Sequence, residues 1–519
     1  MAPCRKSAIP LTLQIFMLAA VTVLLLFIWR GHKGFDLWDE GYLWYGARQL
    51  LLGEIPIRDF EAYDPGRYLW VAAWMELAGD NGIITLRTAT ALFQVLGVFV
   101  ALLTLARSTT RSITPHLLLA NGILVMWMLV YYKMHDYVAS LLLFGSYAHL
   151  VRFPRERGHF IAGLCLGLIA FIGRNHALYG TLALSLILVW LRIRPVAPDR
   201  TRQPIRYLLL GMVLGSSPMA GMMLFVPGFA DAYWQVLQYY LESRATNLSL
   251  ALQMPWELDF SKAPLGRNVA EALLSLYFIA LAAGSLFAVV WVFRRKWRGG
   301  EVPPAWVAAA CLALPYTHYA YSRSDIFHLS FGILPFMLGC LLLAASLTTG
   351  RRWLMLSLLG STSFWVVHVF HPNWDCWGAT PCEEVEISGS LLEVPVNVAN
   401  NIRILRQLTG QYAPDGQPIM VVPIWPSAYP LLDRHAPSWE IFPILPRGPA
   451  FELAEIERIE KAAPRFIMLL NFPLDGRDAL RYQNTHPLTH QFIQEHFERI
   501  TAPPASQAVQ LYKAREGQP

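Results

Sequence analysis

The sequence has little charge for its length. Of its 519 residues only 15% are Asp, Glu, Lys or Arg, whereas a soluble domain averages about 25%. Hydrophobic residues make up 55% of the chain, and the mean hydropathy is +0.37. This composition excludes a cytosolic globular enzyme, a disordered chain and a nucleic-acid-binding protein, because a soluble fold could not bury so much apolar surface.

Cysteines and internal repeats are also scarce. Six cysteines exclude a disulfide scaffold, and no Cys-x-x-Cys pair indicates a metal centre. No repeat of fixed period or low-complexity tract occurs, and the two halves of the apolar region do not look alike. A transporter built from inverted repeats therefore gains no support.

Long apolar blocks fill most of the chain. We interpret the first as a permanent anchor, because Arg30-Gly31-His32 follows it in place of a small-residue cleavage site. In all we predict eleven membrane-spanning helices. They cover residues 9–29, 83–106, 115–132, 137–151, 158–173, 177–191, 207–226, 269–293, 304–321, 329–348 and 353–370.

Basic residues are concentrated in every second connection between these blocks. Those connections hold 18 Lys and Arg residues against three Asp and Glu residues. The opposite short loops carry little more than Lys133, Arg174 and Arg323. Because cytoplasmic loops carry the excess of positive charge, we expect a cytoplasmic N-terminus and an external C-terminus. The expected location is the inner membrane of a bacterium, with the C-terminus in the periplasm.

Three segments on the predicted external side are long: residues 30–82, 227–268 and 371–519. In the last, apolar runs typical of buried strands alternate with amphipathic runs typical of helices. The predicted strands are 417–425, 464–472 and 508–514, and the predicted helices are 451–462 and 488–500. We thus predict a mainly α, polytopic membrane protein. Its transmembrane catalytic domain covers residues 1–370, and a small external α/β domain covers 371–519.

Two cysteines, Cys376 and Cys382, flank a short loop that follows the last apolar block. If the C-terminus is external, they lie in an oxidising compartment. We predict a disulfide between them. Two free thiols at an interface are the alternative.

The first external loop contains two predicted amphipathic helices rich in aromatic residues, as expected for elements in the membrane interface. Asp39 and Glu40 stand at the start of the first helix, and Asp64-Pro65 precedes the second. One interpretation is structural: Asp39 and Asp64 cap the helices, and Glu40 favours the helix dipole. The other is functional, since two adjacent carboxylates at a membrane surface are surrounded by aromatic side chains.

A first span followed by an acidic Asp-Glu pair and interfacial helices resembles the GT-C-fold glycosyltransferases. These include the protein O-mannosyltransferases and the lipid A aminoarabinose transferases. The resemblance covers the layout of the membrane region, the large first external loop and the external C-terminal domain. It implies that Asp39 is the essential base or a metal ligand, with Glu40 beside it.

The resemblance also implies a second acidic motif in the short loop between the third and fourth spans. Asp136, and with it His135, match that motif, and Lys133 lies beside them. A simple polar turn is the alternative. Because no Asp-x-Asp pair is present, we predict no set of metal ligands. A bound divalent metal stays an open alternative, and no other cofactor is expected.

Further ionisable residues cluster on the same predicted face. Residues 318–328 include Arg323, Asp325 and His328, and charges so close to hydrocarbon tend to be functional. We interpret Arg323 and His328 as ligands of a lipid-carrier phosphate, because the guanidinium fork suits a phosphate. The alternative is that Arg323 pairs with Asp325. Arg174 is either a phosphate or sugar contact or a side chain that extends to the membrane surface.

The resulting prediction is glycosyl transfer from a polyprenyl-phosphate sugar to an envelope lipid, glycan or protein, with inversion. Four carboxylates are candidates for catalysis, and four cations are candidates for binding the donor phosphate, with His135 and Asp325 in support. They are Asp39, Glu40, Asp64 and Asp136, and Arg323, His328, Lys133 and Arg174. The alternatives are a transporter or flippase for lipid-linked sugars and a non-catalytic assembly partner. No nucleic acid is an expected partner.

Overall fold

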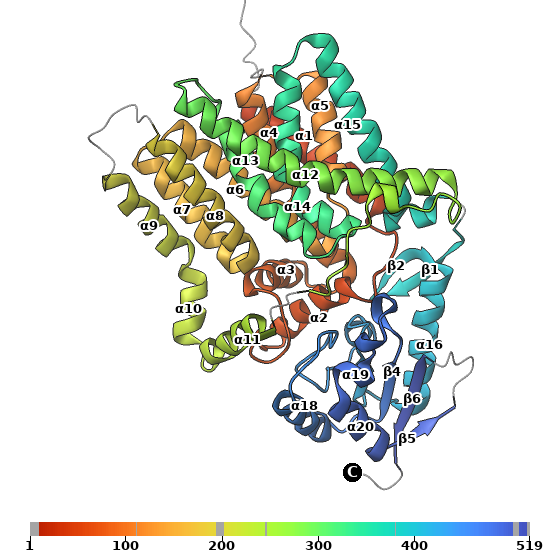
Figure 1. The fold of residues 1–519 in the computed structure, drawn as a ribbon. Helices are drawn as coiled ribbons and strands as arrows, with labels where there is room; N and C mark the ends of the chain where they lie inside the picture. Colours follow the sequence, from red (N-terminus) through yellow and green to blue (C-terminus); the bar gives the residue numbers. More distant parts are fainter. Residues whose placement is uncertain are drawn as a thin grey trace, which may run out of the picture. The chain divides into compact units, whose positions relative to one another are not determined.

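The computed structural model describes residues 10–109, 112–193, 202–243, 247–378, 380–501 and 508–515. The chain forms two compact units (Figure 1). The helical unit comprises residues 1–28, 90–222 and 249–371, and the mixed unit comprises residues 29–89, 223–248 and 372–519. The division into domains 1–370 and 371–519 stays a prediction. The mixed unit joins residues after 371 with the first loop and part of the second.

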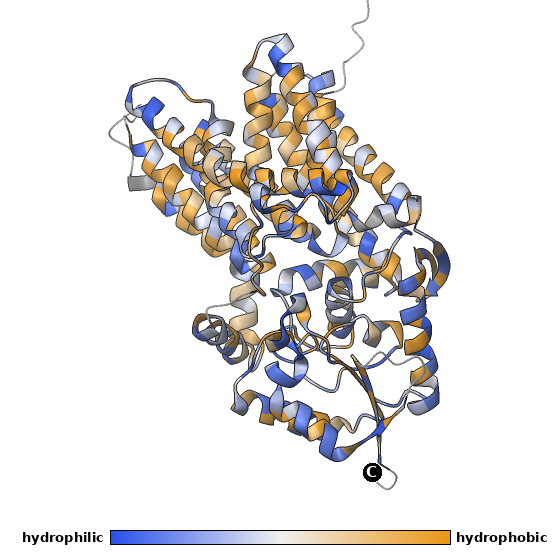
Figure 2. Ribbon diagram, turned by 45° about the vertical axis from the view of Figure 1, so that its right-hand side comes forward, coloured by the Kyte–Doolittle hydropathy of each residue, from blue (hydrophilic) through white to orange (hydrophobic). Residues whose placement is uncertain are grey.

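A helix lies at each of the eleven predicted spans. In chain order these helices are α1 Leu11–Arg30, α4 Ile83–Ser108, α5 Pro115–Met126, α6 Met134–Arg152, α7 Glu156–Ile172, α8 Arg174–Arg192, α9 Arg202–Gly215 with α10 Ser217–Phe225, α12 Leu265–Trp297, α13 Pro304–Tyr321, α14 Ile326–Ser346 and α15 Thr349–Phe370. Most of their residues are hydrophobic (Figure 2).

Within the described ranges, five helices are long and apolar enough to cross a membrane: α1, α4, α12, α14 and α15. The number rises to seven if each of two bent helix pairs is one span. One pair is α9 with α10, bent by 52°, and the other joins α5 to residues 131–152, with a bend of 103°. The chain is an integral membrane protein by this measure, and the count of eleven spans stays a prediction.

The third predicted span, 115–132, is too long, because α5 ends at Met126. Residues 128–130 are not helical, and the backbone N–H of Leu129 donates to the hydroxyl of Tyr137, 3.2 Å away. A side chain therefore satisfies a backbone donor in the gap where helical hydrogen bonds are missing.

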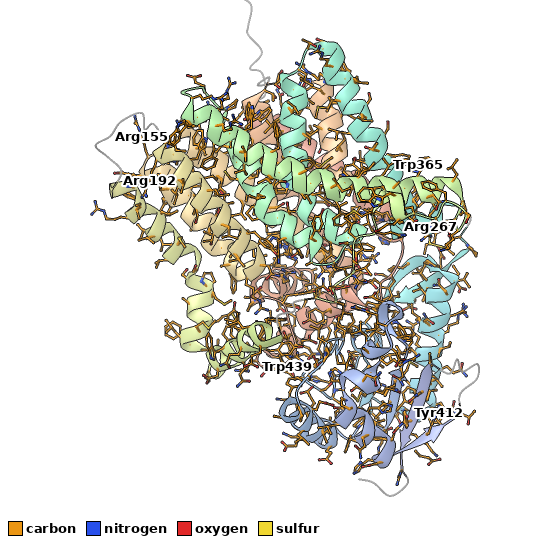
Figure 3. The ribbon with its side chains drawn as sticks, in the orientation of Figure 1. Arg155, Arg192, Arg267, Trp365, Tyr412 and Trp439 are labelled. Carbon is orange, nitrogen blue, oxygen red and sulfur yellow. A yellow bond between two sulfur atoms is a disulfide. The ribbon has the colours of Figure 1, made fainter. Side chains whose placement is uncertain are left out.

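Arginines mark one end of neighbouring helices in the helical unit. Arg155 immediately precedes α7, and Arg192 is the last residue of α8; both lie at the same end of this antiparallel pair (Figure 3). Both belong to connections predicted to be cytoplasmic. The arrangement is the one that alternating basic loops require.

The mixed unit begins with two short helices, α2 Asp39–Leu51 and α3 Pro65–Ala78. Pro65 occupies the first helical position of α3, and Gly79 ends this helix in the left-handed conformation with φ of 62°. Helix α11, Phe229–Ser243, comes from the second loop. The two helices predicted in the first loop are thus confirmed.

Residues after 371 form two sheets with helices around them. A hairpin pairs β1 Cys382–Ile387 with β2 Ser390–Pro395. The second sheet has the order β3-β4-β6-β5, in which β3 and β4 are parallel and the other pairs antiparallel. Its strands are β3 Ile419–Val422, β4 Phe466–Leu470, β5 Phe497–Ile500 and β6 Val509–Ala514, and the helices are α16 Val396–Tyr412, α17 Ala428–Leu431, α18 Pro449–Ala462, α19 Tyr482–Thr485 and α20 Pro487–His496.

The predicted strands 417–425, 464–472 and 508–514 are confirmed as β3, β4 and β6. Every residue of β3 and β4 is buried, which agrees with their unbroken apolar pattern. The predicted helix 488–500 is wrong at its end, because residues 497–500 form β5 and pair with β6. Phe497 joins the buried core there, so sheet pairing outweighs the helical pattern.

The predicted disulfide is present: Cys376 is bonded to Cys382, with Cα atoms 5.5 Å apart. The bond joins the turn after α15 to the first residue of β1.

Candidate functional site

Three carboxylates gather at the start of α2 in the mixed unit. The helix begins at Asp39, and Trp38 occupies the N-cap position, so the interpretation of Asp39 as the N-cap is wrong. Asp39 and Glu40 lie in the first turn, where the helix dipole favours negative charge. Asp36 lies just before the helix, and its carboxylate accepts a hydrogen bond of 2.9 Å from the backbone N–H of Trp38.

Glu40 is neutralised by a buried ion pair. Arg87, in the first turns of α4, donates from Nε to Oε1 of Glu40 at 2.8 Å and from Nη2 to Oε2 at 2.9 Å. The same guanidinium donates to the carbonyls of Gly31 and Gly34, each at 2.8 Å. Both side chains are almost fully buried. This bidentate pair fastens α2 to α4 and fixes the chain between α1 and α2.

Asp36 and Asp39 lie next to Glu40 at the start of α2. Burial, together with the neighbouring charges of Asp39 and Glu40, raises the pKa of Asp36 from 3.8 to about 7. Asp39 is half-buried, and the hydroxyl of Tyr63 donates to its Oδ1 at 3.4 Å. A pKa near neutrality suits a carboxylate that accepts and releases a proton.

Asp64 lies close to this cluster through its neighbour Tyr63. It occupies the N-cap position of α3, in agreement with the structural interpretation, and its Oδ1 accepts a hydrogen bond of 3.4 Å from the hydroxyl of Tyr233 in α11. The guanidinium of Arg67 lies 4.6 Å from the ring centre of Tyr63. Residues from the first and second loops therefore meet around Tyr63 and Asp64.

The aromatic residues of α2 pack inside the mixed unit. Tyr42, Trp44 and Tyr45 are buried, and the ring of Tyr42 lies 4.7 Å from that of Tyr63. Tyr42 also contacts the ring of Phe442, at 6.1 Å. The prediction that this helix lies in the membrane interface was based on these aromatic residues, but protein side chains cover them.

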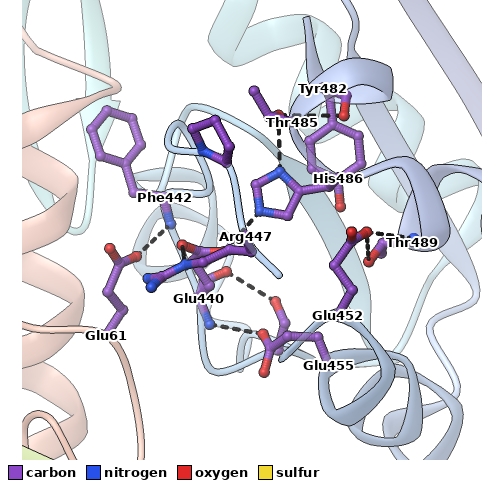
Figure 4. Close-up of polar contacts among 12 residues, drawn as sticks. Glu61, Glu440, Phe442, Arg447, Glu452, Glu455, Tyr482, Thr485, His486 and Thr489 are labelled. Atoms are coloured by element: carbon purple, nitrogen blue, oxygen red, sulfur yellow. Dashed lines mark hydrogen bonds and ion pairs between the residues drawn. The ribbon is translucent and has the colours of Figure 1, made fainter. Parts of the chain in front are cut away.

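A buried polar network joins the first loop to the C-terminal part of the mixed unit (Figure 4). Glu440 accepts from Nε of Arg447 at 2.7 Å and contacts Nε2 of His486 at 3.0 Å. Glu61 accepts from the backbone N–H of Phe442 at 3.0 Å. The network thus ties residues 61, 440–447 and 486 together.

The carboxylates of this network differ in their proton affinity. Burial and the charge of Glu440 raise the pKa of Glu61 well above its ordinary value. Burial acts in the same direction on Glu440, but Arg447 and His486 outweigh it and lower the pKa of that carboxyl. Arg447 also stacks on Tyr239 of α11, 3.7 Å from the ring centre. The network is a structural joint between three segments.

The helical unit holds its own chain of polar residues around Asp136. Nε2 of His176 lies 2.7 Å from Oδ1 of Asp136, and Nδ1 lies 2.8 Å from the hydroxyl of Tyr316. The hydroxyl of Tyr319 donates to the same Oδ1 at 3.4 Å. Asp136, His176 and Tyr316 are buried. The polar-turn alternative for Asp136 is thus wrong, because this residue lies in the first turn of α6 and holds side chains from α8 and α13.

The two cations expected at residues 323 and 328 share one carboxylate. Nε of Arg323 donates to Oδ2 of Asp325 at 2.7 Å, so the alternative pairing is present. Asp325 is the N-cap of α14, and its Oδ1 accepts from the backbone N–H of His328 at 2.9 Å. Burial would raise the pKa of Asp325, but hydrogen bonding and charge from His328, with Arg323, lower it.

The other predicted residues of the helical unit occupy different surroundings. His135 is fully buried, with its ring 4.9 Å from that of Phe93. Lys133 is half-buried, with Nζ 5.9 Å from the ring centre of Phe331, which is also in contact with His328. Arg174 is half-buried at the start of α8. Lys133 and His328 are therefore brought together around one aromatic ring.

The predicted residues fall into two groups. Asp39, Glu40 and Asp64 belong to the mixed unit, and the remaining seven belong to the helical unit. Sequence reasoning missed Asp36, Arg87 and the role of His176. Asp36 had a signal, since it is a third acid three residues before Asp39, whereas Arg87 lay inside an apolar block without any.

The acidic cluster does not fit a divalent cation. Both oxygens of Glu40 are held by Arg87. In the ranges that the structure describes, no three His, Cys, Asp or Glu side chains are placed to hold a metal ion. We therefore derive no step through a metal.

Solved structures of three proteins align with nearly the whole chain at low sequence identity. One is ArnT from Cupriavidus metallidurans in the apo state, with 12% identity, a TM-score of 0.48 and coverage of 96% of this chain and 98% of that chain. Another is the Archaeoglobus fulgidus oligosaccharyltransferase, with 11% identity, a TM-score of 0.46 and coverage of 98% and 74%. A third is arabinofuranosyltransferase AftD from Mycobacteria, with 13% identity, a TM-score of 0.39 and coverage of 98% and 42%. No protein-family model and no curated protein sequence matches the chain.

Proposed function

We propose that this chain is a glycosyltransferase of the bacterial inner membrane that transfers a sugar from a polyprenyl-phosphate carrier to an envelope lipid, glycan or protein. The observation that supports it is the acidic cluster at the start of α2. Arg87 pairs with Glu40, and Asp36 and Asp39 are neighbouring carboxylates, with the pKa of Asp36 raised to about 7. A cluster of this kind is typical of proton-transfer sites.

In the proposed reaction Asp39 is the base, because it is half-buried and lies close to Asp36, whose pKa is raised. Its carboxylate takes the proton of an acceptor hydroxyl while the hydroxyl oxygen forms a bond to the anomeric carbon. The bond from that carbon to the carrier phosphate breaks, and the electron pair leaves with the phosphate. Attack opposite to the leaving group inverts the anomeric centre. Asp64 and Asp136 are the next candidates for the base.

The leaving phosphate needs positive charge as it departs. In this proposal Arg323, His328 and Lys133 of the helical unit supply it, with Arg174 as a further contact. The Arg323 bond to Asp325 uses Nε, and a guanidinium has five N–H donors in all. Asp325 then has a positioning role, because it holds both Arg323 and His328.

A carrier lipid is the expected donor because the proposed site faces the outside. The basic loops predict a cytoplasmic N-terminus and a periplasmic C-terminus. Nucleotide sugars are made in the cytoplasm and do not reach that face. A sugar already attached to a membrane lipid does.

The test combines cells and purified protein. Mass spectrometry of envelope glycans and lipids, with and without the gene, should show one sugar lost from an acceptor. The purified protein in detergent should then transfer sugar from a pool of polyprenyl-phosphate sugars to the acceptor from the deficient cells. Loss of the envelope sugar without transfer in vitro favours the flippase or assembly alternatives, and an unchanged envelope contradicts all three.

The cation role has its own test. Arg323→Lys keeps the charge but loses the planar fork, so KM for the donor should rise more than kcat falls. Arg267→Lys is the matched control, because Arg267 is also paired with a carboxylate, Glu271, on an exposed part of α12. Equal donor KM values in the two variants would remove Arg323 from the phosphate site.

A further inference from the structure

A small pocket lies within the mixed unit, between the last turns of α2 and the segment that follows α17. Its volume is about 230 Å³. This equals the liquid volume of about eight waters. It is below the usual range of about 300–1,000 Å³ for drug-sized ligands, so it suits a single sugar ring. The polar and aromatic residues that line it are Tyr45, Arg48, Gln49, Asp433, Arg434 and His435.

Two of the three cations at this pocket are compensated. Arg48 forms an ion pair with Asp433, and Nη1 of Arg48 donates to the carbonyl of Pro430 at 2.6 Å. Nε2 of His435 lies 2.7 Å from Oε1 of Glu54. The hydrogen bond with Glu54 raises the pKa of His435. The charge of a protonated His435 is therefore compensated by the carboxylate of Glu54.

Arg434 is different. Its Nη1 donates to the carbonyls of Leu432 and Asp433, at 2.8 and 3.2 Å, and no carboxylate pairs with it among the described residues. Its Nε is buried and lacks a hydrogen-bond partner in the same part of the chain. A buried N–H donor without a hydrogen-bond partner is costly unless a ligand atom accepts from it. The pocket therefore has room for one negative charge.

Arg434 requires a hydrogen-bond acceptor on the ligand, and Gln49 requires a donor. This side chain is only 4% exposed, and its Oε1 is buried without a hydrogen-bond partner in the described residues. An amide oxygen accepts hydrogen bonds, so the matching ligand atom is a donor such as a hydroxyl. A single negative charge and hydroxyl groups on one ring define the ligand chemistry. A phosphate monoester fits less well, because it carries nearly two charges.

We propose that this pocket binds a carboxylated sugar, such as a uronic acid, with the carboxylate on Arg434 and a ring hydroxyl on Gln49. That the sugar is a residue of the acceptor glycan rests on the proposed function. Binding itself does not, and it is measured without any donor lipid.

The full-length protein in detergent is titrated with glucuronate, glucuronamide, glucose and inorganic phosphate, and binding is followed by ligand-observed NMR. Glucuronate should bind about tenfold or more tightly than glucuronamide, the neutral isostere, because it gains a charge-assisted bond. This comparison needs no variant. Equal affinities for these two sugars would overturn the proposal, and so would phosphate binding more tightly than glucuronate.

Arg434→Gln should weaken glucuronate binding about tenfold or more and leave glucose binding unchanged. Arg406→Gln is the matched control, because Arg406 is exposed on α16 and donates to the carbonyl of Glu386 at 2.6 Å, away from the pocket residues. Arg434→Lys should keep part of the affinity. If glucuronate binds equally to Arg434→Gln and Arg406→Gln, the sugar acid binds elsewhere. Failure of transfer activity alone would affect the proposed function and not this pocket.

Discussion

Asp39 and Glu40 are neighbours in the chain, yet removing the charge of each should have opposite effects. In Glu40→Gln the guanidinium of Arg87 stays buried and loses its carboxylate. Breaking a buried ion pair by removing one partner costs about 3–5 kcal/mol. The carbonyls of Gly31 and Gly34 still accept from Arg87, which places the expected cost near the lower end.

Asp39→Asn should leave stability nearly unchanged. The side chain is half-buried, keeps its size and loses a dipole interaction of about 0.3–1 kcal/mol. Its contact with Tyr63 is long, at 3.4 Å, and an amide oxygen also accepts it. Transfer should nevertheless fall by about a hundredfold or more, the usual contribution of a positioned base.

Both variants are purified in the same detergent as the wild type, and thermal unfolding is followed by tryptophan fluorescence. About 3 kcal/mol corresponds to a midpoint lowered by roughly 6–12 °C for a unit of a few hundred residues. Sugar transfer is measured well below the lowest midpoint. Glu76→Gln is the control, because Glu76 is an exposed carboxylate on α3. Both its activity and its midpoint should match the wild type.

Two results would refute this reasoning. If Glu40→Gln keeps the wild-type unfolding midpoint and loses activity, Glu40 takes part in the reaction and its ion pair with Arg87 does not stabilise the fold. If Asp39→Asn transfers sugar at the wild-type rate, the base must be sought at Asp36, Asp64 or Asp136. If all of these carboxylates are dispensable, the glycosyltransferase proposal fails.

Three further predictions concern titration, the disulfide and the orientation. Because the folded state raises the pKa of Asp36 from 3.8 to about 7, stability should fall as pH rises across that interval, and Asp36→Asn should equal the wild type at about pH 4 but unfold at a higher temperature at about pH 8; equal midpoints at both pH values would contradict the shift. Reduction of Cys376–Cys382 should cost about 2 kcal/mol, the entropy of a short loop, and alkylation of both thiols in unreduced protein would show that the bond is absent. Reporter fusions after Arg206 and Arg298 should be cytoplasmic, and fusions after Asp259 and at Pro519 external; a cytoplasmic C-terminus would remove the proposed outer-face site.

Much of the fold follows from local patterns in the sequence. Apolar blocks locate a helix at each predicted span, and unbroken runs locate β3, β4 and β6. Secondary structure predicted from local patterns is wrong where contacts with residues distant in the sequence determine the conformation. Residues 497–500 continue a helical pattern but pair with β6, and α5 stops at Met126 because backbone groups after it find other partners.

The candidate site could also be predicted only in part from the sequence. The acids of the first loop and the cluster at 323–328 stood out as charges beside hydrocarbon. Their partners did not, because Arg87 is 47 residues from Glu40 and His176 is 40 residues from Asp136. The partner of each carboxylate is set by these long-range contacts.

The distribution of charge at the start of α2 argues against a purely structural role for all three acids. Stability would be served by one acid in the first turn and one arginine, and Glu40 with Arg87 already provides that pair. Asp36 adds a half-buried carboxylate whose pKa is raised because desolvation and the charges of Asp39 and Glu40 oppose its ionisation. Such repulsion weakens the fold at neutral pH. Side chains that oppose folding stability are expected at functional sites, and in the proposed reaction Asp36 lies beside Asp39, the proposed proton acceptor.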